Sequence, residues 1–299
     1  MGKGPKDRHH SHEGEGAASL KFAFFLNLGF TVTEIVGGVL TNSMAIVADA
    51  VHDLGDSLSL GLAWFLDDYS ARGSDRKYSY GYRRFSLLGA LVTTVILLAG
   101  ILFVVAKAVP RLMHPEPAQA GGMAILSVVG ILVNGAALLR LQRGKSLNVR
   151  MVAWHFLEDV LSWVAVLVVS ILLIFGNLFI LDPILSILIA LYVMVNVLKN
   201  LKKTLELFLQ AVPGDIDLVD IERKLLAIDM VKSIHHLHAW SLDGDHNILT
   251  SHLVVDDRVS DAELVRIRKE IRRILDGLNF EHTAIEIGRE GESCRMKEG

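Results

Sequence analysis

Six long apolar stretches constrain the fold of this 299-residue chain more than any other feature of its sequence. They cover Leu20–Leu40, Met44–Leu66, Phe85–Val109, Met123–Leu141, Val152–Phe175 and Leu178–Leu198. Each holds about 20 residues or more, the length with which a helix crosses a hydrocarbon layer of about 30 Å. We therefore predict an α-helical membrane protein with a polar N-terminal tail over residues 1–19 and six transmembrane helices over residues 20–203. Asp182 followed by Pro183 is typical of the N-cap and first position of the sixth helix.

Basic residues gather on one side of the predicted membrane. They lie at the N-terminus, in or beside the second and fourth loops, and after the sixth stretch: Lys3, Lys6, Arg8, Lys21, Arg72, Arg76, Lys77, Arg83, Arg84, Arg140, Arg143, Lys145, Arg150, Lys199, Lys202 and Lys203. The first and fifth loops, residues 41–43 and 176–177, hold no basic residue. Because cytoplasmic loops are enriched in Lys and Arg, we expect both termini in the cytoplasm.

The sequence after the last stretch has the pattern of a small soluble domain. Apolar residues at helical spacing predict helices near residues 218–228 and 264–274. Strand patterns cover Val231–Trp240, His246–Val255 and Thr283–Ile287. This αββαβ order predicts a cytoplasmic α+β domain of ferredoxin-like type over residues 204–290, followed by a polar tail over residues 291–299.

Ionisable residues inside two apolar stretches carry most of the functional information. His52 and Asp56 are four residues apart in the second stretch, and His155 and Asp159 repeat this spacing in the fifth. Residues four apart share one face of a helix, and a charge at the centre of a spanning helix costs roughly 2.5–3.5 kcal/mol. If the two faces meet, two imidazoles and two carboxylates form a tetrahedral site that suits zinc. Such ligands disfavour calcium and magnesium but leave cobalt, nickel, iron, manganese and cadmium open.

Other acidic residues near these positions have less certain roles. Asp49, one turn before His52, is either an entry ligand or an acceptor for an imidazole N–H. Asp53 and Glu158 point away from the ligand face and are interpreted as cavity-lining or proton-handling groups. Glu34 in the first stretch either forms a packing hydrogen bond or lines the ion path. The alternative for the whole set is a group of buried hydrogen bonds that locks helix packing, but its repetition in two helices favours metal.

Longer motifs around these residues resemble the cation diffusion facilitator family. Residues 43–52 with Asp56 are similar to its second-helix signature, and His155 with Asp159 to its fifth-helix signature. The other similar segments are residues 80–84 and 88–90 at the start of the third helix, residues 182–184 at the start of the sixth, and residues 235–240, His252 and residues 282–285 in the cytoplasmic domain. The resemblance covers nearly the whole chain after about Leu20.

The resemblance implies a homodimer, formed through the cytoplasmic domain and the membrane helices, that exports metal from the cytoplasm in exchange for protons. His52 is similar to the zinc-selective branch, where other branches hold Asp. Segment 142–150 holds no histidine, which is similar to bacterial members, so we expect a bacterial cytoplasmic (inner) membrane. Two departures, Ser86 in the third-helix motif and Gly288 after His282, weaken the transfer of accessory sites from the family.

Histidines of the predicted C-terminal domain are candidates for secondary, regulatory metal sites. The candidate residues are His235, His238, His252 and His282, together with Glu286. On a regular strand His235 and His238 face opposite sides, whereas His236 and His238 share a face. One simple pocket therefore cannot hold all of them, and surface histidines on a small sheet are an equally good interpretation.

We predict a secondary active transporter that exports Zn²⁺, with Cd²⁺, Co²⁺ or other divalent transition metals as further substrates. Histidine titrates near neutral pH, so protons compete with metal for the site and can be exchanged for it. Zinc is also a candidate regulatory ion. We expect a lipid bilayer as the environment, and no organic cofactor, enzymatic activity or nucleic-acid partner.

Three other functions compete with this prediction. A metal-sensing membrane protein would bind the ion without moving it. An intramembrane metalloenzyme would need an open coordination position, which four protein ligands do not leave. A channel would need weaker ligands, because four strong ones hold an ion too long for fast conduction.

Overall fold

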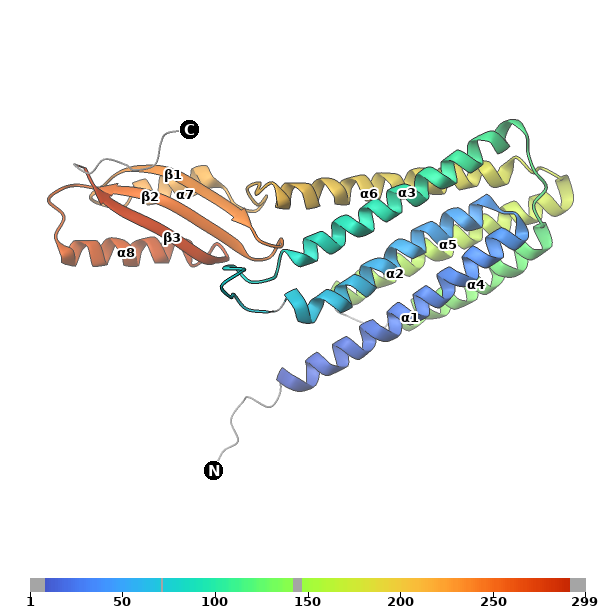
Figure 1. Ribbon diagram of the computed structural model, residues 1–299, viewed down its shortest axis with the longest axis horizontal. Coiled ribbons are helices and arrows are strands. Elements are labelled where there is room, and N and C mark those ends of the chain that lie inside the picture. The colour runs from blue at the N-terminus through green and yellow to red at the C-terminus, as the bar shows by residue number, and fades with distance from the viewer. Residues whose placement is uncertain (1–8, 71, 142–146, 291–299) are drawn as a thin grey trace, which may run out of the picture. The chain divides into compact units, whose positions relative to one another are not determined.

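Six long helices precede a small sheet in the structure (Figure 1), a computed structural model that describes residues 9–70, 72–141 and 147–290. The helices are α1 (His9–Thr41), α2 (Met44–Ser70), α3 (Phe85–Met113), α4 (Ala120–Leu141), α5 (Leu147–Gly176) and α6 (Leu181–Phe208). Within the described residues, four segments are long and apolar enough to cross a membrane: Phe85–Met113, Ala120–Leu139, Ala153–Gly176 and Leu181–Phe208. The chain is therefore an integral membrane protein, as predicted.

The first two helices differ from the other four. α2 holds Asp49, Asp53 and Asp56, which interrupt its apolar character. α1 begins at His9 rather than near the predicted Leu20, so it includes part of the predicted N-terminal tail. The remainder of that tail, residues 1–8, and the predicted C-terminal tail, residues 291–299, lie outside the described residues.

Two apolar clusters hold α2 inside the helical unit (Figure 1). Ala45 and Ile46 pack with residues of α4 and α5 around Trp163, whose side chain is almost fully buried. Met44 and Ala48 pack in the second cluster with residues of α3 and α6. Interiors are close-packed, so a helix held from both sides has little freedom to shift or rotate. The packing of its neighbours therefore fixes where the polar residues of α2 lie.

The Asp182 carboxylate caps α2 rather than α6, which corrects the prediction from sequence. α6 begins at Leu181, so Asp182 lies in the first turn of α6 and not at its N-cap. Its two oxygens accept hydrogen bonds from the Ser43 hydroxyl at 2.6 Å and from the backbone N–H groups of Met44 at 2.8 Å and Ala45 at 3.3 Å. The first N–H groups of any helix lack partners within that helix. Asp182 provides them for α2 and ties the starts of α2 and α6 together.

A three-stranded sheet and two helices form the C-terminal domain (Figure 1). The elements are α7 (Leu218–Leu226), β1 (Val231–Ser241), β2 (Asn247–Val255), α8 (Asp261–Leu275) and β3 (Phe280–Arg289), in the predicted order. β1 and β2 pair antiparallel and β2 and β3 pair parallel, so α8 makes the crossover that a parallel pair needs. Ile221 and Leu225 of α7 and Ile267 and Ile271 of α8 share one apolar core with the sheet.

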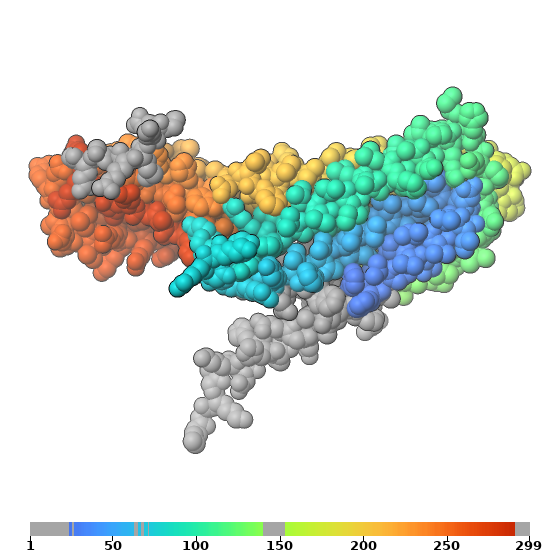
Figure 2. All heavy atoms as spheres, viewed as in Figure 1, coloured from blue at the N-terminus to red at the C-terminus, as the bar shows by residue number. Residues whose placement is uncertain are grey.

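The segment that connects α2 to α3 belongs to the same compact unit as the C-terminal domain. The Asp75 carboxylate accepts hydrogen bonds from the Tyr82 hydroxyl and from the backbone N–H groups of Tyr78 and Lys77, at 2.6–2.7 Å. These bonds, that of Tyr82 first, lower the pKa of Asp75. Arg83 then donates two hydrogen bonds to Glu281 of β3, at 2.9 and 3.0 Å, and Figure 2 shows the segment against the domain.

We expect Asp182→Ala to destabilise the helical unit by about 3 kcal/mol, because three buried donors lose their acceptor at about 1 kcal/mol or more each. Thermal unfolding of the purified protein in detergent measures the loss. Glu116→Ala is the matched control, because Glu116 is half-exposed and forms an ion pair with Arg111, and such pairs contribute about 0–1 kcal/mol. An equal melting temperature for Asp182→Ala and the native chain would contradict the capping role.

The pH dependence of the C-terminal domain follows from Asp256, which comes directly after β2. Hydrogen bonds from the side chain and backbone of Arg258, with a further one from Lys232, hold the pKa of Asp256 below its usual range. A lowered pKa stabilises the fold above the unfolded value of about 3.9, and this stability is lost as pH falls through the folded value. We expect Asp256→Asn to increase hydrogen exchange of the β2 amides at pH 7.

This effect should shrink as the pH falls below about 4, where Asp256 of the unfolded chain takes up a proton while that of the folded chain is still ionised. Native chain and variant are compared at each pH by mass spectrometry. Asp215→Asn, which changes an exposed aspartate in the same domain, is the control and should have little effect. A difference for Asp256→Asn that stays constant down to pH 3 would argue against this source of stability.

Candidate metal-binding site

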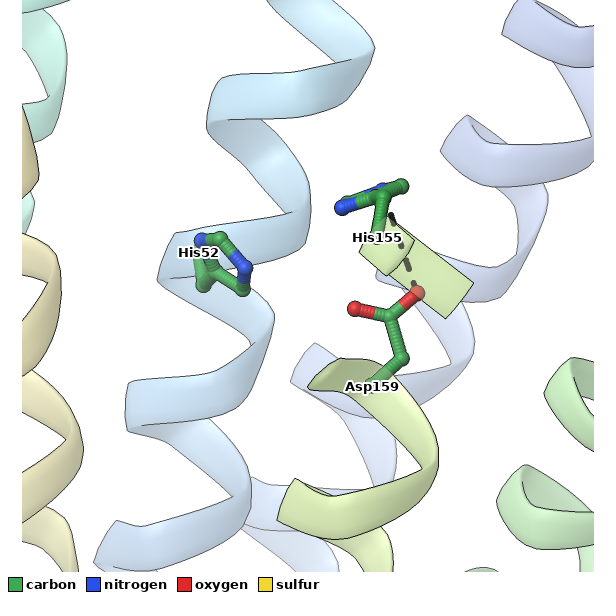
Figure 3. Close-up of side chains that lie close together, drawn as sticks. All are labelled: His52, His155 and Asp159. Atoms are coloured by element: carbon green, nitrogen blue, oxygen red, sulfur yellow. Dashed lines mark ion pairs between the residues drawn. The ribbon is translucent and has the colours of Figure 1, made fainter. Parts of the chain in front are cut away.

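α2 and α5 bring the predicted ligands close together, and Figure 3 shows three of them, His52, His155 and Asp159. The Asp56 carboxylate lies 3.4 Å from Nε2 of His155 and 3.9 Å from Nε2 of His52. Asp159 lies 3.8 Å from Nε2 of His155, and the two imidazole rings are 6.1 Å apart. Ligand atoms of His52, His155 and Asp159 all lie within 4.8 Å of one another, and those of His52, Asp53 and Asp56 form a second group of the same kind. The two faces predicted from the four-residue spacing therefore meet.

Three of these side chains present buried polar atoms without a hydrogen-bond partner among the described residues: Nε2 of His52, Oδ2 of Asp56 and Oδ1 of Asp159. Distances of 3.4–3.9 Å between the imidazoles and carboxylates are too long for hydrogen bonds. This disfavours the alternative in which the four side chains simply lock the helices together. Buried polar atoms are costly unless a partner satisfies them, and a divalent cation is such a partner for His52 and Asp159, which belong to one group of possible ligands.

Access to the cluster differs among its members. The Asp159 side chain is only 8% exposed, whereas those of Asp56 and His155 are each 33% exposed. The cluster is thus more enclosed at Asp159 than at Asp56 and His155.

Asp49 and Ser162 extend the contact between the two helices. Ser162 donates a hydrogen bond of 2.5 Å to the Asp49 carboxylate, whose residue is 3% exposed. Asp49 comes three residues before His52, and Ser162 three residues after Asp159, so this bond lies next to the cluster along both helices. Asp49 belongs to neither group of converging ligand atoms among the described residues. Sequence patterns gave no signal for Ser162, because a serine in an apolar helix is common.

Asp53 lies closer to the cluster than its sequence position suggests. One of its carboxylate oxygens lies within 4.8 Å of ligand atoms of His52 and Asp56, although the side chain starts on an adjacent face of α2. It is 5% exposed, and buried Glu34 of α1 lies beside it. Glu158, in contrast, is exposed and belongs to no such group in the described part of the chain. Helical periodicity places the Cα atoms of Asp53 and Glu158 off the ligand face. It does not predict that the Asp53 carboxylate lies close to ligand atoms of His52 and Asp56.

The candidate histidines of the C-terminal domain separate into different places. His235 of β1, His252 of β2 and Glu286 of β3 pair with one another in a row across the sheet, and the rings of His235 and His252 are 6.2 Å apart. The ring of His238 lies 6.4 Å from that of His236, and His282 stacks edge-on against Tyr80 at 5.7 Å.

β1 is not the regular strand that the predicted facing of these histidines assumed. His236 has a φ of 52°, and the strand register shifts between His235 and His238. Such a bulge interrupts the alternation of faces. Among the described residues, three or more possible ligand groups converge only at α2 and α5, so no preformed metal site is found in the sheet.

Known protein families match this chain along most of its length. The model of the cation efflux transmembrane domain matches residues 20–209. The chain belongs to the cation efflux family. The model of the cation efflux protein cytoplasmic domain matches residues 213–287, and the resemblance to cation diffusion facilitators is thereby confirmed.

Relatives of this cation efflux protein are similar to it over both domains. The metal cation efflux system protein CzcD of Cupriavidus metallidurans is 32% identical over 280 residues, covering 93% of this chain and 88% of the relative. The zinc transporter ZitB of Escherichia coli is 31% identical over 298 residues, covering 97% and 94%. A Bacillus subtilis protein named cadmium, cobalt and zinc/H(+)-K(+) antiporter is 29% identical over 289 residues, covering 95% and 93%.

We expect Asp159→Ala to weaken zinc binding at the cluster by more than about 100-fold, since the loss of a direct ligand should exceed the 10–100-fold typical of its outer partners. Isothermal titration calorimetry of the protein in detergent measures this. Glu158→Gln removes the neighbouring, exposed carboxylate, and this variant should bind zinc with the same affinity as the native chain. If both variants bind zinc as the native chain does, the site lies elsewhere.

Proposed function

We propose that this cation efflux protein exports Zn²⁺ from the cytoplasm in exchange for protons, with Cd²⁺ and Co²⁺ as further substrates. The observation that carries the proposal is the convergence of His52, Asp56, His155 and Asp159 with buried, unsatisfied ligand atoms. Two imidazoles and two carboxylates suit a tetrahedral transition metal better than calcium or magnesium. The names of the relatives, which include zinc, cadmium and cobalt, point to the same substrates.

In this proposal α1 and α2 also span the membrane, giving six transmembrane helices. Their polar side chains support this, because Thr31, Glu34, Asp49, Asp53 and Ser57 are all at most 5% exposed. Polar groups within a membrane are tolerated when they face the bundle interior or a cavity. The basic residues of the N-terminus and of the second and fourth loops support a cytoplasmic position for both termini. We assign the protein to a bacterial cytoplasmic membrane.

The four ligands perform the exchange by alternating between metal and protons. Zinc from the cytoplasm enters beside Asp56 and His155, the more exposed members of the cluster. It binds the deprotonated imidazoles and carboxylates, so that its arrival releases protons. A rearrangement of the helices then opens the site to the other side, where a higher proton concentration returns protons to the ligands and zinc leaves. The proton in the name of the Bacillus relative agrees with this coupling.

We also propose that the protein works as a homodimer, through a C-terminal domain of ferredoxin-like type and the membrane helices. The short name of the matching domain model, ZT_dimer, supports dimerisation. Zinc held at the row of His235, His252 and Glu286 would favour the dimer that is competent for transport. The buried Nδ1 of His252, which has no hydrogen-bond partner among the described residues, is consistent with a ligand there.

Zinc uptake into proteoliposomes with a proton gradient tests the transport function. We expect the native chain and Glu158→Gln to accumulate zinc only while the gradient is maintained. Asp159→Ala should reduce uptake to the level of empty liposomes, because the ion loses its most enclosed ligand. Collapse of the gradient with an ionophore is the internal control.

Two outcomes would overturn the proposal in different ways. Zinc binding without flux in the native, well-folded protein would establish the metal-sensing alternative. Zinc flux that does not depend on the proton gradient would support the transport function but contradict the exchange for protons.

A further inference from the structure

A cavity of about 320 Å³ lies between the segment that connects α2 to α3 and the C-terminal domain, within one compact unit. Its cations are Lys77, Arg83 and Arg84, and none of the described residues that line it is acidic. The cavity is just large enough for a small polar group. Its position in the chain matters as well, because Phe85, which also lines it, begins the membrane-spanning helix α3.

The three cationic side chains differ in the partners that they already have within the protein. Arg83 is paired with Glu281 through two hydrogen bonds. Lys77 lies near Asp75, whose pKa its charge helps to lower, and its ammonium lies 5.3 Å from the centre of the Tyr78 ring. Arg84 differs from both, since its Nε is buried and has no hydrogen-bond partner among the described residues. The cavity therefore has one guanidinium whose buried Nε–H has no partner among the described residues.

An anion with several oxygen atoms is the chemical partner that this arrangement fits. A guanidinium presents its N–H groups as a planar fork that matches a phosphate group, and a buried charge without a partner is costly. Hydroxyl groups can add hydrogen bonds to such a ligand, and Ser79 and Tyr80 line the same cavity. Metal cations are excluded by the positive charge of the lining.

The neighbouring aromatic residues point to a lipid as the source of the phosphate. Tyr78, Tyr80, Phe85 and Trp240 line the cavity beside the cations. Aromatic side chains with a polar tip are typical of the level of the lipid headgroups, and basic pockets at the cytoplasmic ends of membrane helices bind anionic headgroups. We propose that this cavity binds the phosphate-bearing headgroup of an anionic phospholipid, with Arg84 as its principal ligand.

Bound lipid connects the segment to the domain in this proposal. Arg83 and Tyr80 already contact Glu281 and His282 of β3. A headgroup on Arg84 would add a bridge between the connecting segment and the residues Gln210 and Trp240 on the opposite wall of the cavity. The inference concerns lipid recognition only and stands whether or not the helices carry zinc.

Native mass spectrometry of the full chain in detergent tests the site, with phosphatidylglycerol and phosphatidylcholine of identical acyl chains as probes. We expect the native chain to retain one phosphatidylglycerol per protomer with at least tenfold preference over phosphatidylcholine. Arg84→Gln should abolish this preference, and Arg84→Lys, which keeps the charge but loses the fork, should reduce it. Arg76→Gln is the matched control, because Arg76 is exposed in the same segment and does not line the cavity.

Three results would overturn the assignment. Preference retained in both Arg84 variants would exclude Arg84 as the ligand, and an equal loss in Arg76→Gln would mean a diffuse charge effect. If inorganic phosphate binds the native chain in an Arg84-dependent way while neither lipid is preferred, the site takes the free anion instead. Should Arg84→Gln fail to fold, the comparison of Arg84→Lys with Arg76→Gln decides.

Discussion

The cost of burying ionisable groups without a partner is the constraint on which the rest of this structure depends. α2 holds Asp49, His52, Asp53 and Asp56 among apolar residues, and its buried carboxylates need polar partners from neighbouring helices or an ion. α5 provides the complementary face with His155, Asp159 and Ser162, and the apolar clusters on either side of α2 keep the two faces in register. The candidate metal site and the packing of the helices therefore have the same physical origin.

Two buried carboxylates, Asp182 of α6 and Asp49 of α2, stabilise the N-terminal part of α2 through hydrogen bonds. Asp182 accepts three hydrogen bonds at the helix start, and Asp49 accepts one from Ser162 further along. Both acceptors are satisfied, whereas ligand atoms of His52, Asp56 and Asp159 are not. The satisfied carboxylates fix the position of α2, whereas the unsatisfied atoms are the ones that remain available to an ion.

The sequence predicted that the four candidate ligands lie close together, because helical periodicity determines which residues share a face. It could not predict the partner of Asp182, since the carboxylate that caps α2 lies on α6, far along the chain. Nor could strand alternation place the histidines of β1, because His236 adopts a positive φ that breaks the alternation locally. Asp53 was placed off the ligand face from its Cα position, whereas its carboxylate reaches the cluster through side-chain torsions.

The hydrogen bond between Asp49 and Ser162 has a consequence for motion. It joins α2 and α5 on one side of the cluster, the same side on which Asp182 anchors the start of α2. Separation of α2 from α5 at this end would leave the buried Asp49 carboxylate without its donor, whereas separation at Asp56 and His155 breaks no hydrogen bond between the two helices among the described residues. The structure therefore favours opening between α2 and α5 at the end of Asp56 and His155.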